Sequence, residues 1–367
     1  MIALWSRQAL AVLRLEMRKT FFARRGLWIY LLAAAPVLLF AAHSFNEFRI
    51  REQRQDRVRR TGAPLSREKT SEISTGMTRD DVIARLGQPG REENYHRFIP
   101  EPGQRRRKRV SLDYLWYSDV NTDFIVRLQD GVVVGTGRRG GDNLNDDILA
   151  FAAVFQLFYL RLAVFFGCLG VFMNLFRGEL LDKSLHFYFL APLRREVVLA
   201  GKFAAGLVAT LTIFTASTLL QLWAISWHID ANALRQYLWQ GHGIAHVAAY
   251  VGVTALACVG YGSIFLAAGV FFRNPIVPAA LALIWESANW FLPAALKKIS
   301  VIFYLQSLSP IVTPAGMDVP APLQLLASTA SATPAALAIP GLILVALAAL
   351  TVAALRLRRM EINYGAD

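Results

Sequence analysis

Long apolar stretches alternate with polar ones along this chain of 367 residues. A bilayer core of about 30 Å is crossed by roughly 20 residues of α-helix, and six stretches approach or exceed that length. Their ranges are 27–44, 148–176, 197–227, 244–272, 276–296 and 335–355. Pro36 and Pro278 fall inside two of them, which membrane helices tolerate because neighbouring helices satisfy the freed carbonyls. The pattern predicts an all-α polytopic membrane protein with about six transmembrane helices.

A basic amphipathic segment, residues 5–23, precedes the first predicted span. Its apolar positions recur at helical spacing and basic residues fill the other faces: Leu10, Leu13, Met17 and Phe21, against Arg7, Arg14, Arg18 and Lys19. Such a helix is either solvated or lies in the membrane interface, and the interface is favoured because a span follows at once. We therefore expect residues 1–26 to form an interfacial helix.

Charge sets the predicted orientation. Only 18% of the residues are charged, against about 25% in soluble proteins, yet the formal net charge is +13. The excess lies before the first span, between the second and third, between the fourth and fifth, and after the sixth. Cytoplasmic loops carry such an excess of lysine and arginine. With six spans, both termini, including the tail 356–367, are predicted to be cytoplasmic, in contact with the lipid bilayer.

The same topology places the long polar segment 45–147 outside the membrane. It is basic, but long domains translocate largely regardless of charge. Residues 45–72 are predicted to be a polar linker or a helix extending span 1. Residues 73–139 have the pattern of a small α+β module, inserted between spans 1 and 2.

Local signals define the elements of this insert. TGMTRDDVIARLGQPG offers a threonine N-cap, Thr75 or Thr78, before an apolar helical face that stops at Gly87. Two strand-like stretches follow, and Asp130-Gly131 is a strong hairpin signal. Residues 105–109, RRRKR, are expected to be a solvated loop; attraction to lipid headgroups or a polyanion is the alternative. Nucleic acid is not expected, because aromatic residues are not interleaved.

Proline interrupts the last outer segment. Residues 297–334 are moderately apolar, but four prolines break them. We predict short re-entrant or surface helices at the outer face, followed by the sixth span. The domain plan is therefore one interfacial helix, one span, the insert, spans 2 to 5 within 148–296, this segment and the last span.

The sequence does not predict catalytic or metal chemistry. No G-x-x-x-x-G-K-[ST] motif occurs, so the chain is not expected to hydrolyse ATP. Cys168 and Cys258 lie in apolar runs and indicate core positions. His242 and His246 stand at i and i+4 but have no neighbouring carboxylate, so no metal site is predicted. Neither a cofactor nor an enzymatic activity is expected of this chain.

The loop between spans 2 and 3 carries a family resemblance. RGELLDKSLHFYFLAPLRREVVLAGKFAAGL at 177–207 resembles the coupling loop of type-2 ATP-binding-cassette (ABC) exporter permeases, with its R-x-E, K-s-L, P-x-R-R and GK elements. The matching positions are Arg177, Glu179, Lys183, Leu185, Pro192, Arg194, Arg195 and Lys202. The interfacial helix, the six spans and the broken segment before span 6 are similar to the same family. The resemblance covers the chain except 45–147.

This resemblance implies a partner that the chain lacks. In the family the loop docks onto a separate ABC ATPase, which binds ATP and Mg²⁺. Residues 177–202 are thus expected to dock an ATPase, with Phe187 and Tyr188 as apolar anchors among the charges. A second permease subunit is implied as well, in a homo- or heterodimer. The alternative is that these charges are ordinary positive-inside residues without a partner.

Two ionisable residues fall inside predicted spans. Arg161 lies in span 2 and Glu286 about mid-way along span 5. Such groups normally face the bundle interior or a wet cavity. The hypothesis is that they form an ion pair or jointly line a route where spans 2 and 5 meet in the resembled family. The alternative is a structural role, or an arginine that reaches the interface.

The insert has a resemblance of its own. GMTRDDVIARLGQP, followed by aromatic and apolar strands, is similar to the periplasmic domain of the BamE/SmpA/OmlA lipoprotein group. The lipoprotein cysteine is absent, so spans 1 and 2 would tether the module. This implies the bacterial cytoplasmic (inner) membrane and a possible envelope-protein partner.

Two function classes follow. The first is the permease of an ABC exporter. The second is a non-transporting scaffold or sensor whose outer module binds envelope proteins; it predicts no ATPase partner and indifference to changes in the loop. An intramembrane enzyme is weaker, because no nucleophile or metal set surrounds Arg161 and Glu286.

Overall fold

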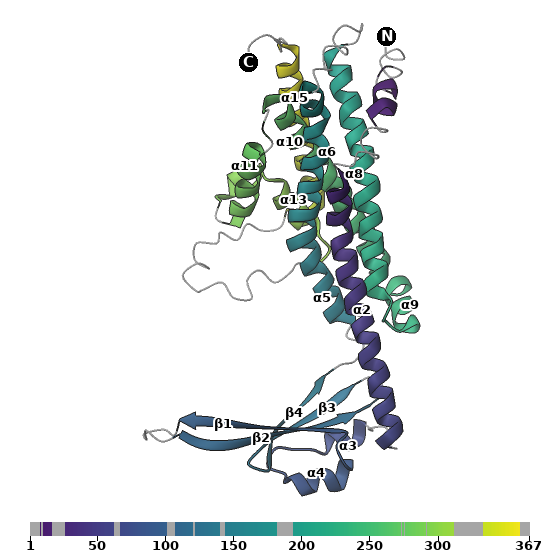
Figure 1. Cartoon of the computed structure of the whole chain (residues 1–367), viewed down its shortest axis with the longest axis vertical. Helices are drawn as coiled ribbons and strands as arrows, with labels where there is room; N and C mark the ends of the chain where they lie inside the picture. Colours follow the sequence, from purple (N-terminus) through teal and green to yellow (C-terminus); the bar gives the residue numbers. More distant parts are fainter. Residues whose placement is uncertain are drawn as a thin grey trace. The chain divides into compact units, whose positions relative to one another are not determined.

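The computed structural model describes residues 8, 10–16, 26–61, 67–100, 107–119, 122–139, 144–181, 194–272, 274, 276–290, 292–311 and 333–359. The chain forms two compact units (Figure 1). The first comprises residues 1–41, 147–227 and 231–367, and its described part is helical. The second comprises residues 42–146 and 228–230 and contains the sheet.

Long helices make up the first unit. They are α2 (Leu27–Thr61), α5 (Leu144–Val154), which continues through the π-helix η2 (Phe155–Val164) into α6 (Phe165–Leu181), α8 (Arg195–Ser226), α10 (Gly243–Phe271) and α15 (Ala335–Arg358). The part of α2 beyond Ala41 and the first residues of α5 belong to the second unit. Among the described residues, five helical segments are long and apolar enough to cross a membrane: Leu27–Gln53, Asp146–Phe176, Arg195–Ser226, Gly243–Phe271 and Ala335–Arg358. They match predicted spans 1, 2, 3, 4 and 6. A polytopic membrane architecture is confirmed.

The predicted fifth span, 276–296, is not one helix. It consists of α11 (Ile276–Ser287), the 3₁₀ turn η3 (Ala288–Trp290) and α12 (Ala294–Lys297), which α13 (Val301–Leu308) follows. The 12 residues of α11 extend about 18 Å, well short of the bilayer core. Pro293 precedes α12 and disfavours helix for the residue before it. The prediction of about six continuous spans is therefore corrected to five in the described part of the chain.

The interrupted segment nevertheless returns the chain from one end of the helical unit toward the other. Arg356 lies over the Phe271 ring, 5.8 Å from its centroid, so α10 and α15 finish at the same end. The chain between them must travel back before α15 begins at Ala335. In Figure 1, α11 and α13 lie along that path.

An aromatic ring and two glycines bring three helices together. Phe172 of α6 is fully buried. A Cβ atom added at Gly206 of α8 or at Gly262 of α10 would lie 2.6 Å from the Phe172 ring, closer than real contacts allow. The two glycines therefore form a notch that accepts the ring, in keeping with the small residues that let membrane helices approach.

The second unit holds an antiparallel meander of β1 (Arg91–Pro100), β2 (Arg107–Ser118), β3 (Asp123–Gln129) and β4 (Val132–Arg139), in that order. Two short helices, α3 (Arg67–Ser71) and α4 (Arg79–Leu86), precede it. Val82 of α4 packs into a core with Leu115, Val126 and Leu128 of the sheet. The small α+β insert is therefore confirmed, and α2 extends span 1 as far as Thr61.

Turn and cap signals in the insert are confirmed. Asp130 and Gly131 have φ of 50° and 84°, the positive values that a two-residue hairpin turn requires. Thr78, one of the two predicted threonines, is the N-cap of α4, and Gly87 is its C-cap. Strand β1 was not predicted, because REENYHRFIP is rich in charged and polar residues; its register with β2 makes it a strand.

The α4 capping box predicts a pH-dependent step. Thr78 donates from its hydroxyl (2.7 Å) and backbone N–H (3.1 Å) to the Asp81 carboxylate, and these bonds lower the pKa of Asp81. A carboxylate whose folded pKa is depressed stabilises the fold above its unfolded pKa of about 3.9 and loses that contribution as pH falls through the folded pKa. Hydrogen exchange of the α4 amides in the full chain, corrected for intrinsic rates, should accelerate below about pH 4.

Asp81→Asn should abolish this acid-dependent acceleration. The matched control Asp80→Asn, one residue earlier, should retain it. Acceleration of the same size in Asp81→Asn and in wild type would show that the capping carboxylate is not its source.

Candidate functional site

The predicted docking loop begins and ends on long helices. Arg177 and Glu179 belong to the last turns of α6, and Arg194 is the N-cap of α8. Four predicted docking residues lie outside the described residues: Lys183, Phe187, Tyr188 and Pro192. The part that the structure describes thus fixes the two flanks of the loop, one at the end of α6 and the other at the start of α8.

Lys202 lies inside the helical unit. Its side chain has no exposed surface, and its Nζ donates to Glu16 Oε1 at 2.7 Å and to the Leu175 carbonyl at 2.9 Å. The ammonium also lies 5.4 Å from the centroid of the Phe176 ring. Glu16 is likewise buried, at 3% exposed. This ion pair holds the N-terminal helical segment, residues 10–16, against α6 and α8.

Arg195 ties the start of α8 to the end of α15. Its Nη1 donates to the carbonyls of Leu357 and Arg358, at 2.9 Å each. These carbonyls belong to the last helical turn, where the donors four residues further on in an α-helix are missing. Arg358 in turn forms an ion pair with Glu196. Sequence reasoning assigned Arg195 to a partner and overlooked Glu196, which no motif distinguishes.

Arg194 differs from its neighbour in exposure. It is exposed, and with Arg195, Glu196 and Arg358 it lines a hollow of about 420 Å³ at this end of the unit. Three guanidinium groups and one carboxylate give the hollow a positive balance. Such a surface complements acidic side chains or other anions.

Glu286 anchors the short helix α13. At 7% exposed, its Oε2 accepts hydrogen bonds from Ser300 Oγ (2.8 Å) and the Ile302 N–H (2.9 Å). Its Oε1 accepts one from the Val301 N–H at 3.0 Å. The carboxylate therefore satisfies two of the N–H groups that the start of a helix leaves without partners. No signal in the sequence links residue 286 to residues 300–302.

Arg161 lies in the π-helical segment η2. Its Nε and Nη2 are buried and have no hydrogen-bond partner among the described residues, and the same holds for the Tyr261 hydroxyl. The charges of Arg161 and Glu286 lie close enough to influence each other, yet no ion pair joins Arg161 and Glu286 in the described part of the chain. The hypothesis that both residues line a route stays a prediction. A π-helical segment often marks a functional position.

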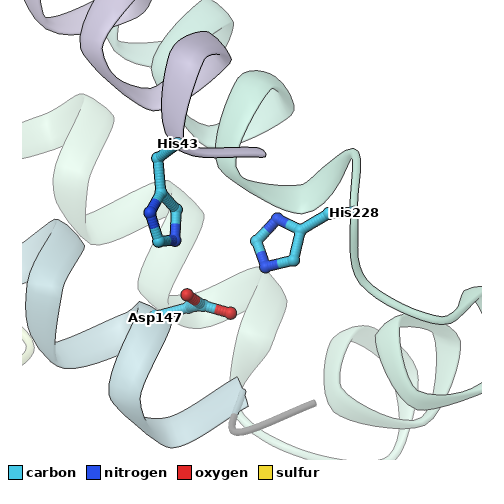
Figure 2. Close-up of side chains that lie close together, drawn as sticks. All are labelled: His43, Asp147 and His228. Carbon is cyan, nitrogen blue, oxygen red and sulfur yellow. The ribbon is translucent and has the colours of Figure 1, made fainter. Parts of the chain in front are cut away.

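Two histidines far apart in the sequence lie side by side. His43 is on α2 and His228 directly follows α8, and their ring centroids are 5.4 Å apart in an edge-to-face arrangement (Figure 2). The His228 Nδ1 is 3.0 Å from Ser44 Oγ. Of the four histidines His43, His228, His242 and His246, spacing singles out only His242 and His246, because it reveals neighbours within one helix but not between helices.

Comparisons with known proteins assign no family. A scan against protein-family models finds none that matches the chain, and a search of curated proteins finds no match. The class that the structure defines is a polytopic membrane protein with a small α+β insert. Any finer identity depends on the residues of the loop and the insert and on the contacts described above.

Proposed function

We propose that the chain is the membrane-spanning permease subunit of an ABC exporter, driven by a separate ATPase that docks on residues 177–202. The hydrogen bonds that Arg195 and Lys202 make at one end of the helical unit support this proposal most directly. Arg195 bonds to α15, and Lys202 bonds to α6 and to the segment containing Glu16. Both flanks of the loop are therefore connected to helices that are long enough to cross the membrane.

This arrangement suits the transmission of force. When the ATPases close on ATP, they push the loop, and the push enters α6 and α8 together. Arg195 extends the movement to α15, and Lys202 extends it to the N-terminal segment. In the proposed exporter two permease subunits face each other, and the movement opens a route between them near Arg161 and Glu286.

The remaining parts have roles in the same proposal. The N-terminal segment lies in the membrane interface, both termini are cytoplasmic, and the insert lies outside the bacterial cytoplasmic membrane, where it binds or positions an envelope component. ATP and Mg²⁺ are held by the ATPase, and this chain performs no hydrolysis.

The test is a capture experiment with loop variants. The full chain is purified in detergent with its partners, and an ATPase carrying G-x-x-x-x-G-K-[ST] is expected among them. Phe187→Asp/Tyr188→Asp should reduce its capture about tenfold or more, since an aromatic anchor supplies that much binding energy. Arg195 is left intact, because its bonds to α15 would confuse docking with folding.

Arg235→Asp, in α9 (Ala231–Trp239) beyond the other end of α8, is the matched control and should capture the ATPase like wild type. Size-exclusion profiles check that each variant is folded. Envelope proteins captured without any ATPase would favour the scaffold or sensor function and overturn the transporter.

A further inference from the structure

An arginine in the middle of a membrane helix carries hydrogen-bond donors that no described residue uses. Arg161 is the midpoint of the 31-residue apolar segment Asp146–Phe176, and its Nε and Nη2 atoms are buried without a partner among the described residues. The hydroxyl of Tyr261, on α10, is buried in the same condition. We propose that Arg161 and Tyr261 bind an oxyanion, a carboxylate or phosphate group, inside the helical unit.

The two nitrogens of Arg161 form one edge of its planar guanidinium group. The Nε–H and one N–H of Nη2 point the same way, and carboxylates and phosphates occupy such a fork with two parallel hydrogen bonds. Both atoms of this edge are buried, but the side chain as a whole is partly exposed, which leaves a ligand a way to reach it. Apolar neighbours accept no hydrogen bond, so the fork selects a ligand with two acceptor oxygens.

The charge of Arg161 also lacks a direct counter-ion. An arginine within a membrane span is costly and normally pairs with an acidic group or with backbone carbonyls. The charge of Glu286 lies close enough to influence Arg161, but both carboxylate oxygens of Glu286 accept hydrogen bonds from donors at the start of α13 instead. The guanidinium fork is therefore available to an anionic group from outside the chain.

Aromatic packing holds Tyr261 near Arg161. The ring of Phe165, four residues after Arg161, meets the Tyr261 ring edge-on with 5.3 Å between the centroids. Tyr261 is 1% exposed, so its hydroxyl stays within the bundle, and it lies close enough to Arg161 for the charge of that residue to act on it. Two donors from the guanidinium group and one from the phenol therefore supply the same region of the helical unit.

The π-helical segment η2 fixes the position of Arg161 between two other helices. It packs against α10 and α13, and Gln156 of η2 donates from Nε2 to the Ile311 carbonyl, just beyond α13, at 2.6 Å. At the start of α13, a Cβ atom added at Gly260 of α10 would lie 2.9 Å from a methyl group of Val301. Close packing on both sides holds the donors in place, and π-helical turns occur frequently at functional sites.

The site gives the proposed transport function a chemical class of cargo. In that respect it rests on the proposed function: a transported molecule that binds here carries a carboxylate or a phosphate group. Binding itself needs no ATPase and is measured without one. Capture of an ATPase by the loop can therefore fail while the oxyanion binds, and the reverse, so the failure of either proposal is distinguishable from the failure of the other.

The experiment is a calorimetric titration of the purified full chain in phosphatidylcholine nanodiscs with acetate and with inorganic phosphate, at an ionic strength matched with chloride. Saturable binding of at least one of the two is expected. Arg161→Lys keeps the charge and loses the fork, and Tyr261→Phe loses the phenol donor. Each should weaken binding about tenfold or more, since each removes a hydrogen bond to a charged group.

A second arm identifies the source of the oxyanion. Nanodiscs that contain phosphatidic acid are used, and native mass spectrometry counts the lipid bound to each chain. More phosphatidic acid on wild type than on Tyr261→Phe would identify a lipid phosphate as the ligand. Equal amounts, with acetate or phosphate still bound in the first arm, would identify a soluble oxyanion.

Tyr250→Phe is the matched control and should bind the oxyanion as wild type does. Tyr250 is on the same helix, and its hydroxyl is likewise buried without a partner among the described residues, so the variant removes the same atom elsewhere. Tyr261→Phe removes a hydroxyl that no described residue uses and should fold even if Arg161→Lys does not. Absence of binding to wild type in both arms, which would leave only water at the fork, or binding that Tyr261→Phe does not weaken in either arm, would overturn the proposal.

Discussion

Replacing Lys202 with methionine is expected to lower the free energy of unfolding by about 3–5 kcal/mol, because the change removes a counter-charge that lies in contact with the buried Glu16 carboxylate. Lys202 has no exposed surface and Glu16 is 3% exposed, with 2.7 Å between Nζ and Oε1. The same substitution removes the bond to the Leu175 carbonyl. Chemical unfolding of the full chain in detergent measures the effect.

The double variant Lys202→Met/Glu16→Leu separates charge from packing. A buried pair replaced by apolar residues of similar size is often neutral in stability, so the double variant should recover most of the loss. Equal destabilisation in the single and double variants would contradict the buried ion pair and would point to packing alone. The N-terminal segment should also become accessible to protease in the single variant only.

Replacing Glu286 with leucine is expected to have the second large effect, lowering the free energy of unfolding by roughly 2–6 kcal/mol. It leaves the Val301 and Ile302 N–H groups without acceptors, and each buried unsatisfied donor costs about 1–3 kcal/mol. Glu286→Gln is the sharper comparison. An amide oxygen in the place of Oε2 keeps the bonds from Ser300 and Ile302 and loses only the one from Val301. It should therefore cost about 1–3 kcal/mol.

The glutamine variant also separates the structural role of Glu286 from a role in transport. It removes the charge and keeps most of the cap. A folded Glu286→Gln protein that assembles and transports normally would contradict the hypothesis that the Glu286 charge lines the route. A folded protein that has lost transport would support it. Ser300→Ala, which removes one donor without stranding an N–H, is the control for a small disturbance of the same contact.

The membrane helices could be predicted because each is a continuous apolar run whose composition and length suffice to define it. The same criterion, a long apolar run, failed at 276–296. The composition there stays apolar, but Pro293 and the hydrogen bonds of Glu286 to the start of α13 break the helix. Hydropathy measures how apolar a segment is, but it does not show where the helical hydrogen bonds of that segment end.

Local chemistry was predictable in the insert for a similar reason. The Asp130-Gly131 turn and the Thr78 cap depend on residues adjacent in the sequence. Contacts across long separations were not predictable. Lys202 has the sequence context of a docking residue, and only folding brings Glu16 beside it. The ring contact between His43 and His228 is likewise brought about only by folding.

The notch that receives Phe172 has a consequence for motion in the membrane. With its ring packed against Gly206 and Gly262, Phe172 prevents α6 from sliding along α8 or α10, because a slide would push the ring against the neighbouring side chains. Each helical residue advances 1.5 Å, so even a shift of one residue unseats it. We therefore expect α6, α8 and α10 to tilt as a single rigid body. Because Trp28 of α2 packs against Gly170 of α6 in the same way, displacement relative to that body is expected in helices outside such contacts, such as α11.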